Sequence, residues 1–187
     1  MSIQNQTRRL NVKRIAMDAM FIAMHIVFAS FFSFKTPIVE ISLASLPVLL
    51  CAVLYGPLDG LVVGLCGAFV EQLLYGLTPT APLWILPAML QGLAVGLLAR
   101  SLYYKGGRRA WVLVLVVACG ELLLTATNTA ALYLDAHIVG YSVKALYLIL
   151  PTRLLNCVVR AIISSAIILP LLKPLEKLVG KIRGANV

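Results

Sequence analysis

The segment LYLILPTRLLNCVVRAIISSAIILPLL (residues 146–172) is almost entirely apolar and long enough to cross a bilayer as one helix. Within it, four polar side chains are spaced by three or four residues, so a helix places them on one face: Arg153, Asn156, Arg160 and Ser164. An arginine inside hydrocarbon costs at least ~2.5 kcal/mol and is expected to face protein or a water-filled cavity. Two arginines on one face therefore require anions, which are either carboxylates of this chain or a molecule that it binds.

The composition of the whole chain is that of a polytopic membrane protein. Of its 187 residues, 61% are hydrophobic and 12% are charged, and the mean hydropathy is +0.96. A soluble domain of this size cannot bury so much apolar surface. The polar N-terminus and the absence of a convincing small-x-small cleavage site argue against a cleavable signal peptide.

The net charge of +9 comes from basic clusters at residues 8–14, 105–109 and 173–183, each of which flanks an apolar span. This arrangement is typical of cytoplasmic loops of membrane proteins rather than of a nucleic-acid surface, so we expect no nucleic-acid partner. The four cysteines lie within apolar spans without C-x-x-C spacing or a suitably placed histidine, which favours packing over a metal site or disulfide. We therefore expect neither a metal nor a cofactor.

These patterns predict an all-α integral membrane protein with six transmembrane helices in a single domain, residues 1–187. The predicted helices cover about 14–34, 40–55, 57–75, 83–102, 111–134 and 146–172, between a polar N-terminus (1–12) and a basic tail (173–187). All three basic clusters lie on the cytoplasmic side only if the short second span crosses the membrane. Both termini are then cytoplasmic in a multi-pass protein of the cell membrane.

Polar side chains of several predicted helices fall in the same half of the membrane under this topology. Those expected in the outer half are Glu71, Trp84, Asn128, Arg153 and Asn156, and those expected deeper are Gln91, Glu121 and Arg160. They predict a compact bundle with an outward-facing binding cup. Gly60, Gly64 and Gly67 share one face of the third span, where close contact with another helix or with a flat ligand is possible.

Other functions explain fewer of these residues. The chain has no Gly-x-Ser motif with a partner histidine, no H-E-x-x-H and no P-loop, so we expect no enzyme activity. A channel or proton relay is an alternative use of the buried charges, but the broken helices of secondary transporters are absent. Internal ion pairs, Glu71 with Arg153 and Glu121 with Arg160, or a non-transport scaffold subunit, account for the charges but not for the aromatic and amide side chains.

A ligand-binding cup accounts for more of the pattern. Trp84, Tyr75 and Phe34 suit stacking on a flat ring. Glu71 is suited to accept two parallel hydrogen bonds from a 2-amino-4-oxo heterocycle, and Arg153 to bind a carboxylate or a carbonyl. Asn128 and Asn156 supply both donors and acceptors.

With six short helices, basic ends inside and the motif Ala19-Met-Phe-Ile-Ala23 in the first helix, the chain resembles an S component of an energy-coupling factor (ECF) vitamin importer. The resemblance implies that Ala19 and Ala23 dock onto a transmembrane T component, and that two cytoplasmic ATPases drive the cycle. It also implies a small-molecule vitamin ligand, a surround of membrane lipid and a bacterial source.

Among S components, the chain is most similar to the folate type over residues 41–67, where it carries Leu46-Pro47, Gly56-Pro57-Leu-Asp-Gly60 and Gly64-Leu-Cys-Gly67. Folate-type members carry an acid directly after the last glycine, whereas this chain has Ala68 there and Glu71 one turn later. A queuosine precursor shares the 2-amino-4-oxo edge of a pterin, so Glu71 suits either ligand. The glutamate tail of a folate requires a second cation, Lys35 or Lys144.

Overall fold

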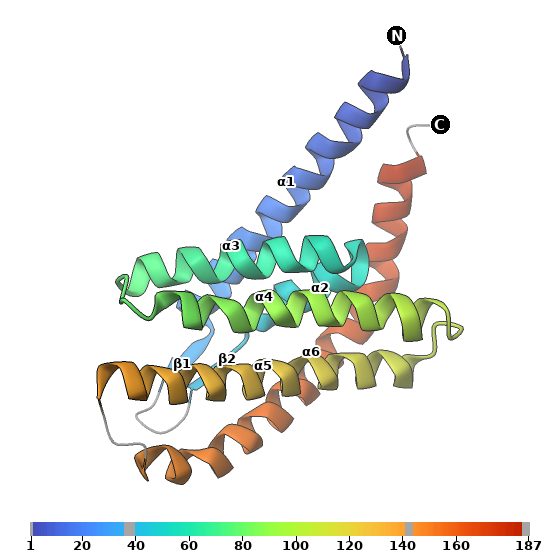
Figure 1. The fold of residues 1–187 in the computed structure, drawn as a ribbon. Coiled ribbons are helices and arrows are strands. Elements are labelled where there is room, and N and C mark those ends of the chain that lie inside the picture. The colour runs from blue at the N-terminus through green and yellow to red at the C-terminus, as the bar shows by residue number, and fades with distance from the viewer. Residues whose placement is uncertain (1, 36–39, 141–143, 185–187) are drawn as a thin grey trace.

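The computed structural model describes residues 2–35, 40–140 and 144–184, with side chains over residues 12–33, 42–140 and 149–178. Its elements in chain order are α1 (Ser2–Phe31), β1 (Ser33–Lys35), β2 (Glu40–Ser42), α2 (Ser45–Tyr55), α3 (Pro57–Tyr75), α4 (Ala81–Leu98), the π-helical extension η1 (Ala99–Tyr104), α5 (Ala110–Val139) and α6 (Lys144–Gly184) (Figure 1). The predicted helical membrane fold is confirmed, with one antiparallel hairpin added.

Within the described part of the chain, five helical segments are long and apolar enough to cross a membrane: Val12–Phe31, Pro57–Tyr75, Ala81–Tyr104, Ala110–Val139 and Ile149–Leu178. The remaining helix, α2, has 11 residues. It therefore rises about 16 Å, roughly half of the hydrocarbon thickness. The sequence predicted this span at residues 40–55, but its first residues belong to β2 and the helix begins at Ser45.

The short helix α2 is the centre of the bundle. It is apolar on every side, and Leu46, Val48, Leu49 and Val53 are at most 2% exposed. It contacts α1, α3, α4 and α6, which enclose it. A helix that is hydrophobic all round is stable only when it is buried, and this enclosure provides the burial.

The glycine face of α3 packs against α4. A Cβ added at Gly92 would lie 2.0 Å from the carbonyl oxygen of Gly60, and one added at Gly64 would lie 2.3 Å from that of Ala88. Small residues at such crossings allow the two backbones to approach closely. The sequence left open whether Gly60 and Gly64 contact another helix or a flat ligand, and the structure shows that they contact another helix, α4.

Three helices run further than the sequence suggested. The first, α1, begins at Ser2 instead of near residue 14, so residues 2–12 of the predicted polar N-terminus are helical. The polar residues Asp135 and His137 do not interrupt α5, which ends at Val139 and is followed by Gly140, a glycine in the left-handed conformation that favours helix termination. Pro170 and Pro174 do not end α6, which continues to Gly184, so part of the predicted basic tail is helical. A proline removes one helical hydrogen bond and bends a helix without having to end it, and α6 is visibly bent (Figure 1).

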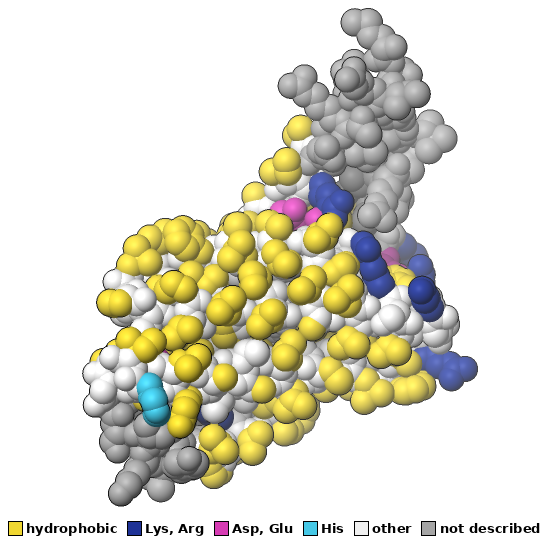
Figure 2. Space-filling model, in the orientation of Figure 1, with side chains coloured by type: hydrophobic (Ala, Val, Ile, Leu, Met, Phe, Trp, Pro, Cys, Tyr) yellow, Lys and Arg dark blue, Asp and Glu magenta, His cyan; other side chains and the backbone are white. Residues whose placement is uncertain are grey.

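The two ends of the bundle differ in charge. Figure 2 shows most of the Lys and Arg side chains of this face near the end that carries the termini and the α4–α5 turn. Apolar side chains cover the outer faces of α3, α4 and α5 between the ends. On α3 they form an exposed stripe at helical spacing, Leu58, Val62, Leu65, Phe69 and Leu73. Such an apolar surface suits contact with lipid.

Candidate functional site

A cavity of about 530 Å³ lies at the opposite end of the bundle, where α3 ends and α4 begins. All six helices and β2 contribute to its wall. Its polar and aromatic lining consists of His25, Ser42, Ser45, Glu71, Gln72, Tyr75, Trp84, Gln91, Thr125, Asn128, Arg153, Asn156 and Arg160. Pockets of this size and mixed character accommodate small organic ligands.

Six of the eight side chains predicted to bind substrate line this cavity together: Glu71, Tyr75, Trp84, Asn128, Arg153 and Asn156. The other two, Phe34 and Lys35, lie in β1, and their side chains are outside the described part of the chain. Tyr75 is 55% exposed and donates a hydrogen bond to the carbonyl of Ala29, 3.3 Å away.

The acidic side of the cavity is formed by Glu71 and His25. The Nδ1 atom of His25 lies 2.7 Å from the carbonyl oxygen of Ala44, and its Nε2 atom lies 3.3 Å from Oε2 of Glu71. Because a carbonyl oxygen only accepts, the N–H of Nδ1 donates to Ala44. A hydrogen bond between Nε2 and Glu71 then requires a second proton, on Nε2 or on the carboxyl group. His25 is 3% exposed, so this arrangement fixes the orientation of the carboxylate at the cavity wall.

Gly67 makes this arrangement possible. It is the last glycine of the face on α3, and a Cβ at this position would lie 2.8 Å from the imidazole ring of His25. Any larger residue would displace the ring. The third glycine of the predicted face therefore makes room for a side chain of α1 that reaches Glu71.

Glu121 links three helices behind the basic side of the cavity. Its carboxylate is fully buried, accepts a hydrogen bond from Ser45 of α2 at 2.7 Å and lies 3.5 Å from the guanidinium of Arg160 on α6. Ser164 donates to the same carboxylate at 3.4 Å. Arg160 also donates to Thr125 at 2.9 Å. The internal pair of Glu121 and Arg160, one of the alternatives open from the sequence, is thus present.

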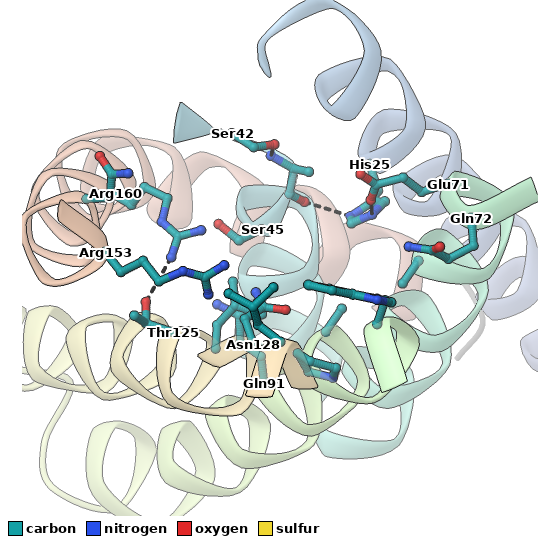
Figure 3. Close-up of a pocket in the computed structure, with 18 of the residues that line it drawn as sticks. His25, Ser42, Ser45, Glu71, Gln72, Gln91, Thr125, Asn128, Arg153 and Arg160 are labelled. Carbon is teal, nitrogen blue, oxygen red and sulfur yellow. Dashed lines mark hydrogen bonds and ion pairs between the residues drawn. The ribbon is translucent and has the colours of Figure 1, made fainter. Parts of the chain in front are cut away.

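Arg153 and Asn156 lie on the same face of α6 as Arg160 and nearer to the start of that helix. The guanidinium of Arg153 reaches Thr129 at 3.5 Å, and Asn156 is 9% exposed. In Figure 3 the two arginines lie on one side of the cavity and Glu71 with His25 on the other, with Ser45, Gln91 and Asn128 between them. The cavity therefore presents acceptors at one side and cationic donors at the other.

This arrangement suits binding of a polar molecule. A carboxylate held by a histidine accepts donors from a ligand, and guanidinium groups bind carboxylates or carbonyls on the opposite side. No group of three potential metal-binding side chains was found among the described residues.

Several side chains line the cavity although they were not among those predicted to bind substrate: His25, Ser45, Gln91, Thr125 and Arg160. A usable signal existed for His25 and Gln91, because ionisable and amide side chains within apolar spans are costly unless they have a role. Ser45 and Thr125 gave no such signal, since single hydroxyl groups are common in membrane helices.

The two alanines predicted to contact a partner, Ala19 and Ala23, are exposed on the outer face of α1. Ala16 continues the strip, and Met20 and Val27 beside it are 47% and 46% exposed. The strip is therefore accessible to another helix or to lipid. Small side chains of this kind allow a second helix to approach closely.

The profile of the family described as "ECF transporter, substrate-specific component" matches residues 13–172. The fold is also similar to solved structures. ThiT from Listeria monocytogenes has a TM-score of 0.71 at 21% identity, with 90% of this chain and 97% of that chain covered. FolT bound with folic acid has a TM-score of 0.63 at 25% identity, with 84% and 94% covered. An S-component for biotin from an ECF-type ABC transporter has a TM-score of 0.65 at 18% identity, with 88% and 93% covered. A search of curated protein sequences gave no match.

Proposed function

This chain belongs to the family of ECF transporter substrate-specific components, and we propose that its cavity captures folate or a related 2-amino-4-oxo heterocycle. Members of this family bind the substrate of a transporter, so the chain is a transport component and not an enzyme. It lies in a membrane and crosses it several times. The identity of the ligand is the part that we infer from the site.

The observation that carries the proposal is the opposition of charge across one cavity. Glu71 lies on one side and Arg153 on the other, and both line the same space (Figure 3). A carboxylate binds the adjacent amino and ring N–H groups of a 2-amino-4-oxo heterocycle through two parallel hydrogen bonds. The contact with His25 holds Glu71 in place for this role and leaves the carboxylate further lone pairs to accept from a ligand.

The remaining predicted residues have defined roles in this proposal. Trp84 supplies an aromatic face for the heterocycle, and Asn128 and Asn156 bind its other polar atoms. Arg153 binds the carboxylate of a folate tail. The proposed second cation for that tail is Lys35 or Lys144, whose side chains are outside the described residues.

A queuosine precursor is the alternative ligand, since its heterocycle carries the same 2-amino-4-oxo edge. The two classes differ in the tail, because a folate carries carboxylates and a small deazaguanine does not. FolT bound with folic acid is among the similar structures at 25% identity, which supports the folate class. Replacing Arg153 with Gln is expected to weaken binding of folic acid and to leave binding of 7-deazaguanine nearly unchanged.

S components of this family work with a T component and ATPases. We propose that the exposed strip of Ala19 and Ala23 is the surface that meets the T component. We further propose that the chain lies in a bacterial cell membrane with both termini in the cytoplasm and the cavity facing outward. The concentration of basic residues at the end opposite the cavity supports this orientation.

Native mass spectrometry of the protein purified from its source membrane tests the proposed ligand. We expect one retained small molecule per chain, with the mass of a folate or of another 2-amino-4-oxo heterocycle. A protein that carries no such molecule, and whose unfolding temperature is unchanged by folic acid and by 7-deazaguanine, would contradict the proposal.

A further inference from the structure

Gln91 of α4 is fully buried and lines the cavity, yet its amide has no partner in the described part of the chain. Neither the oxygen nor the nitrogen of the side chain forms a hydrogen bond with any residue that the structure describes. Most buried polar side chains in native proteins are hydrogen-bonded, and an amide with both ends unsatisfied is costly. The partner for this amide is therefore expected among the contents of the cavity: water in the free protein and ligand in the complex.

In the described part of the chain, the polar side chains that also line the cavity do not form hydrogen bonds with the Gln91 amide. Glu121, Ser45, Thr125 and Arg160 form one connected set of hydrogen bonds and an ion pair between α2, α5 and α6. Gln91 lines the same cavity but is not part of that set. A side chain kept only for packing of the helices would be expected to join the set or to be apolar.

The direction of Gln91 follows from the packing of α4. Trp84, Pro87 and Ala88 line the cavity with Gln91, at the spacing of one helical face. The next residue, Gly92, is in contact with the backbone of Gly60, where an added Cβ would lie 2.0 Å from the carbonyl oxygen. This contact prevents rotation of α4 about its axis, so the helix holds Gln91 against the cavity.

The geometry points to Gln91 as a ligand-binding residue that recognises an edge carrying a hydrogen-bond acceptor beside a donor, as a cyclic amide does. A glutamine amide presents one acceptor and two donors in a plane and matches such an edge with two hydrogen bonds. Glu71, by contrast, only accepts when ionised. Together the two residues would select heterocycles that combine a donor edge with an amide-like edge. This inference rests on the proposed function and adds a specificity-determining residue to it.

The test replaces Gln91 with Met, which has a similar length and no amide. The matched control is Ser165→Ala on α6. The hydroxyl of Ser165 is also buried and has no hydrogen-bond partner among the described residues, but it does not line the cavity. Binding of folic acid and of 7-deazaguanine to the purified proteins is measured by titration calorimetry. The unfolding temperature of each protein is measured without added ligand.

We expect Gln91→Met to weaken binding of the probe by about 10- to 100-fold, because two buried hydrogen bonds are lost, and Ser165→Ala to leave it unchanged. The unfolding temperature of the ligand-free Gln91→Met protein should equal or exceed that of the parent, because the substitution removes no hydrogen bond between described residues. Unchanged affinity in Gln91→Met, while the parent binds, would overturn the role of Gln91 without affecting the proposed function.

If the parent binds neither probe, the proposed ligand class fails, and the unfolding temperature then decides the inference about Gln91. A temperature of Gln91→Met well below that of the parent would assign Gln91 to the stability of the fold and overturn the inference. A temperature equal to or above that of the parent would support a role of Gln91 toward some other ligand.

Discussion

Removing the charge of Glu121 is expected to destabilise the protein strongly. The carboxylate is fully buried and lies 3.5 Å from Arg160, whose side chain is only 12% exposed. Glu121→Gln leaves an acceptor for Ser45 but strands the guanidinium of Arg160 without its counter-charge. Removing one partner of a buried ion pair typically costs about 3–5 kcal/mol. For a chain of this length, that corresponds to a fall of roughly 6–20 °C in the unfolding temperature.

The assay is thermal unfolding in detergent, followed by far-UV circular dichroism. The double variant Glu121→Gln/Arg160→Met removes the stranded charge as well, and we expect it to recover about 1–3 kcal/mol relative to the single variant. The control is Glu176→Gln, since Glu176 lies 3.5 Å from Arg108 but the two side chains are 23% and 61% exposed. That variant should lose at most about 1 kcal/mol. A Glu121→Gln protein as stable as the parent, or a double variant less stable than the single one, would refute the account of this pair.

Three further variants test other parts of the structure. Ala19→Trp should leave ligand affinity unchanged and abolish uptake with the T component and ATPases. The control Leu155→Trp, also on an exposed face, should transport normally. Uptake by the Ala19→Trp protein would exclude the proposed docking surface. Gly92→Ala should lower the unfolding stability by about 1–3 kcal/mol in thermal denaturation, because its Cβ would lie 2.0 Å from a backbone oxygen, and an unchanged stability would contradict the close contact of α3 and α4. His25→Phe keeps a ring of similar size but removes the hydrogen bonds to Ala44 and Glu71. Titration calorimetry should therefore show binding of folic acid weakened about 10-fold. Equal affinity would contradict the role of His25 in holding Glu71.

It was predictable that these polar side chains lie at one end of the bundle, because each has a fixed position along its helix. Glu71 lies one turn from the end of α3, and Trp84 lies one turn from the start of α4, so the turn between them brings both to one end of the bundle. The same reasoning placed Asn128, Arg153 and Asn156 at that end. Helical spacing and the alternation of crossings are sufficient for this inference.

The partner of Glu71 was not predictable in the same way. Sequence spacing gives the face of a helix on which a residue lies, but not which neighbouring helix that face meets. His25 reaches Glu71 because α1 packs against α3 at Gly67, which has no side chain to fill the space. The contact therefore depends on how two helices pack, which the periodicity of either helix alone does not determine.

The limits of α2 and α6 were also difficult to predict from the sequence. The residues before α2 pair as β1 with β2, and strands of three residues are too short to produce an alternating pattern. In α6, Pro170 and Pro174 resemble a termination signal, yet the helix bends and continues to Gly184. Proline inside a helix is compatible with either outcome, and the tertiary structure selects between them.

Binding of folic acid and 7-deazaguanine to the purified protein and to Glu71→Gln tests the central claim most directly. The account predicts saturable binding of at least one of these compounds at one site per chain. It also predicts that Glu71→Gln binds that compound about 10- to 100-fold more weakly, because a charge-assisted pair of hydrogen bonds is lost. Equal affinity of the two proteins, or no binding of either compound by the parent, would contradict the claim that Glu71 receives a 2-amino-4-oxo edge.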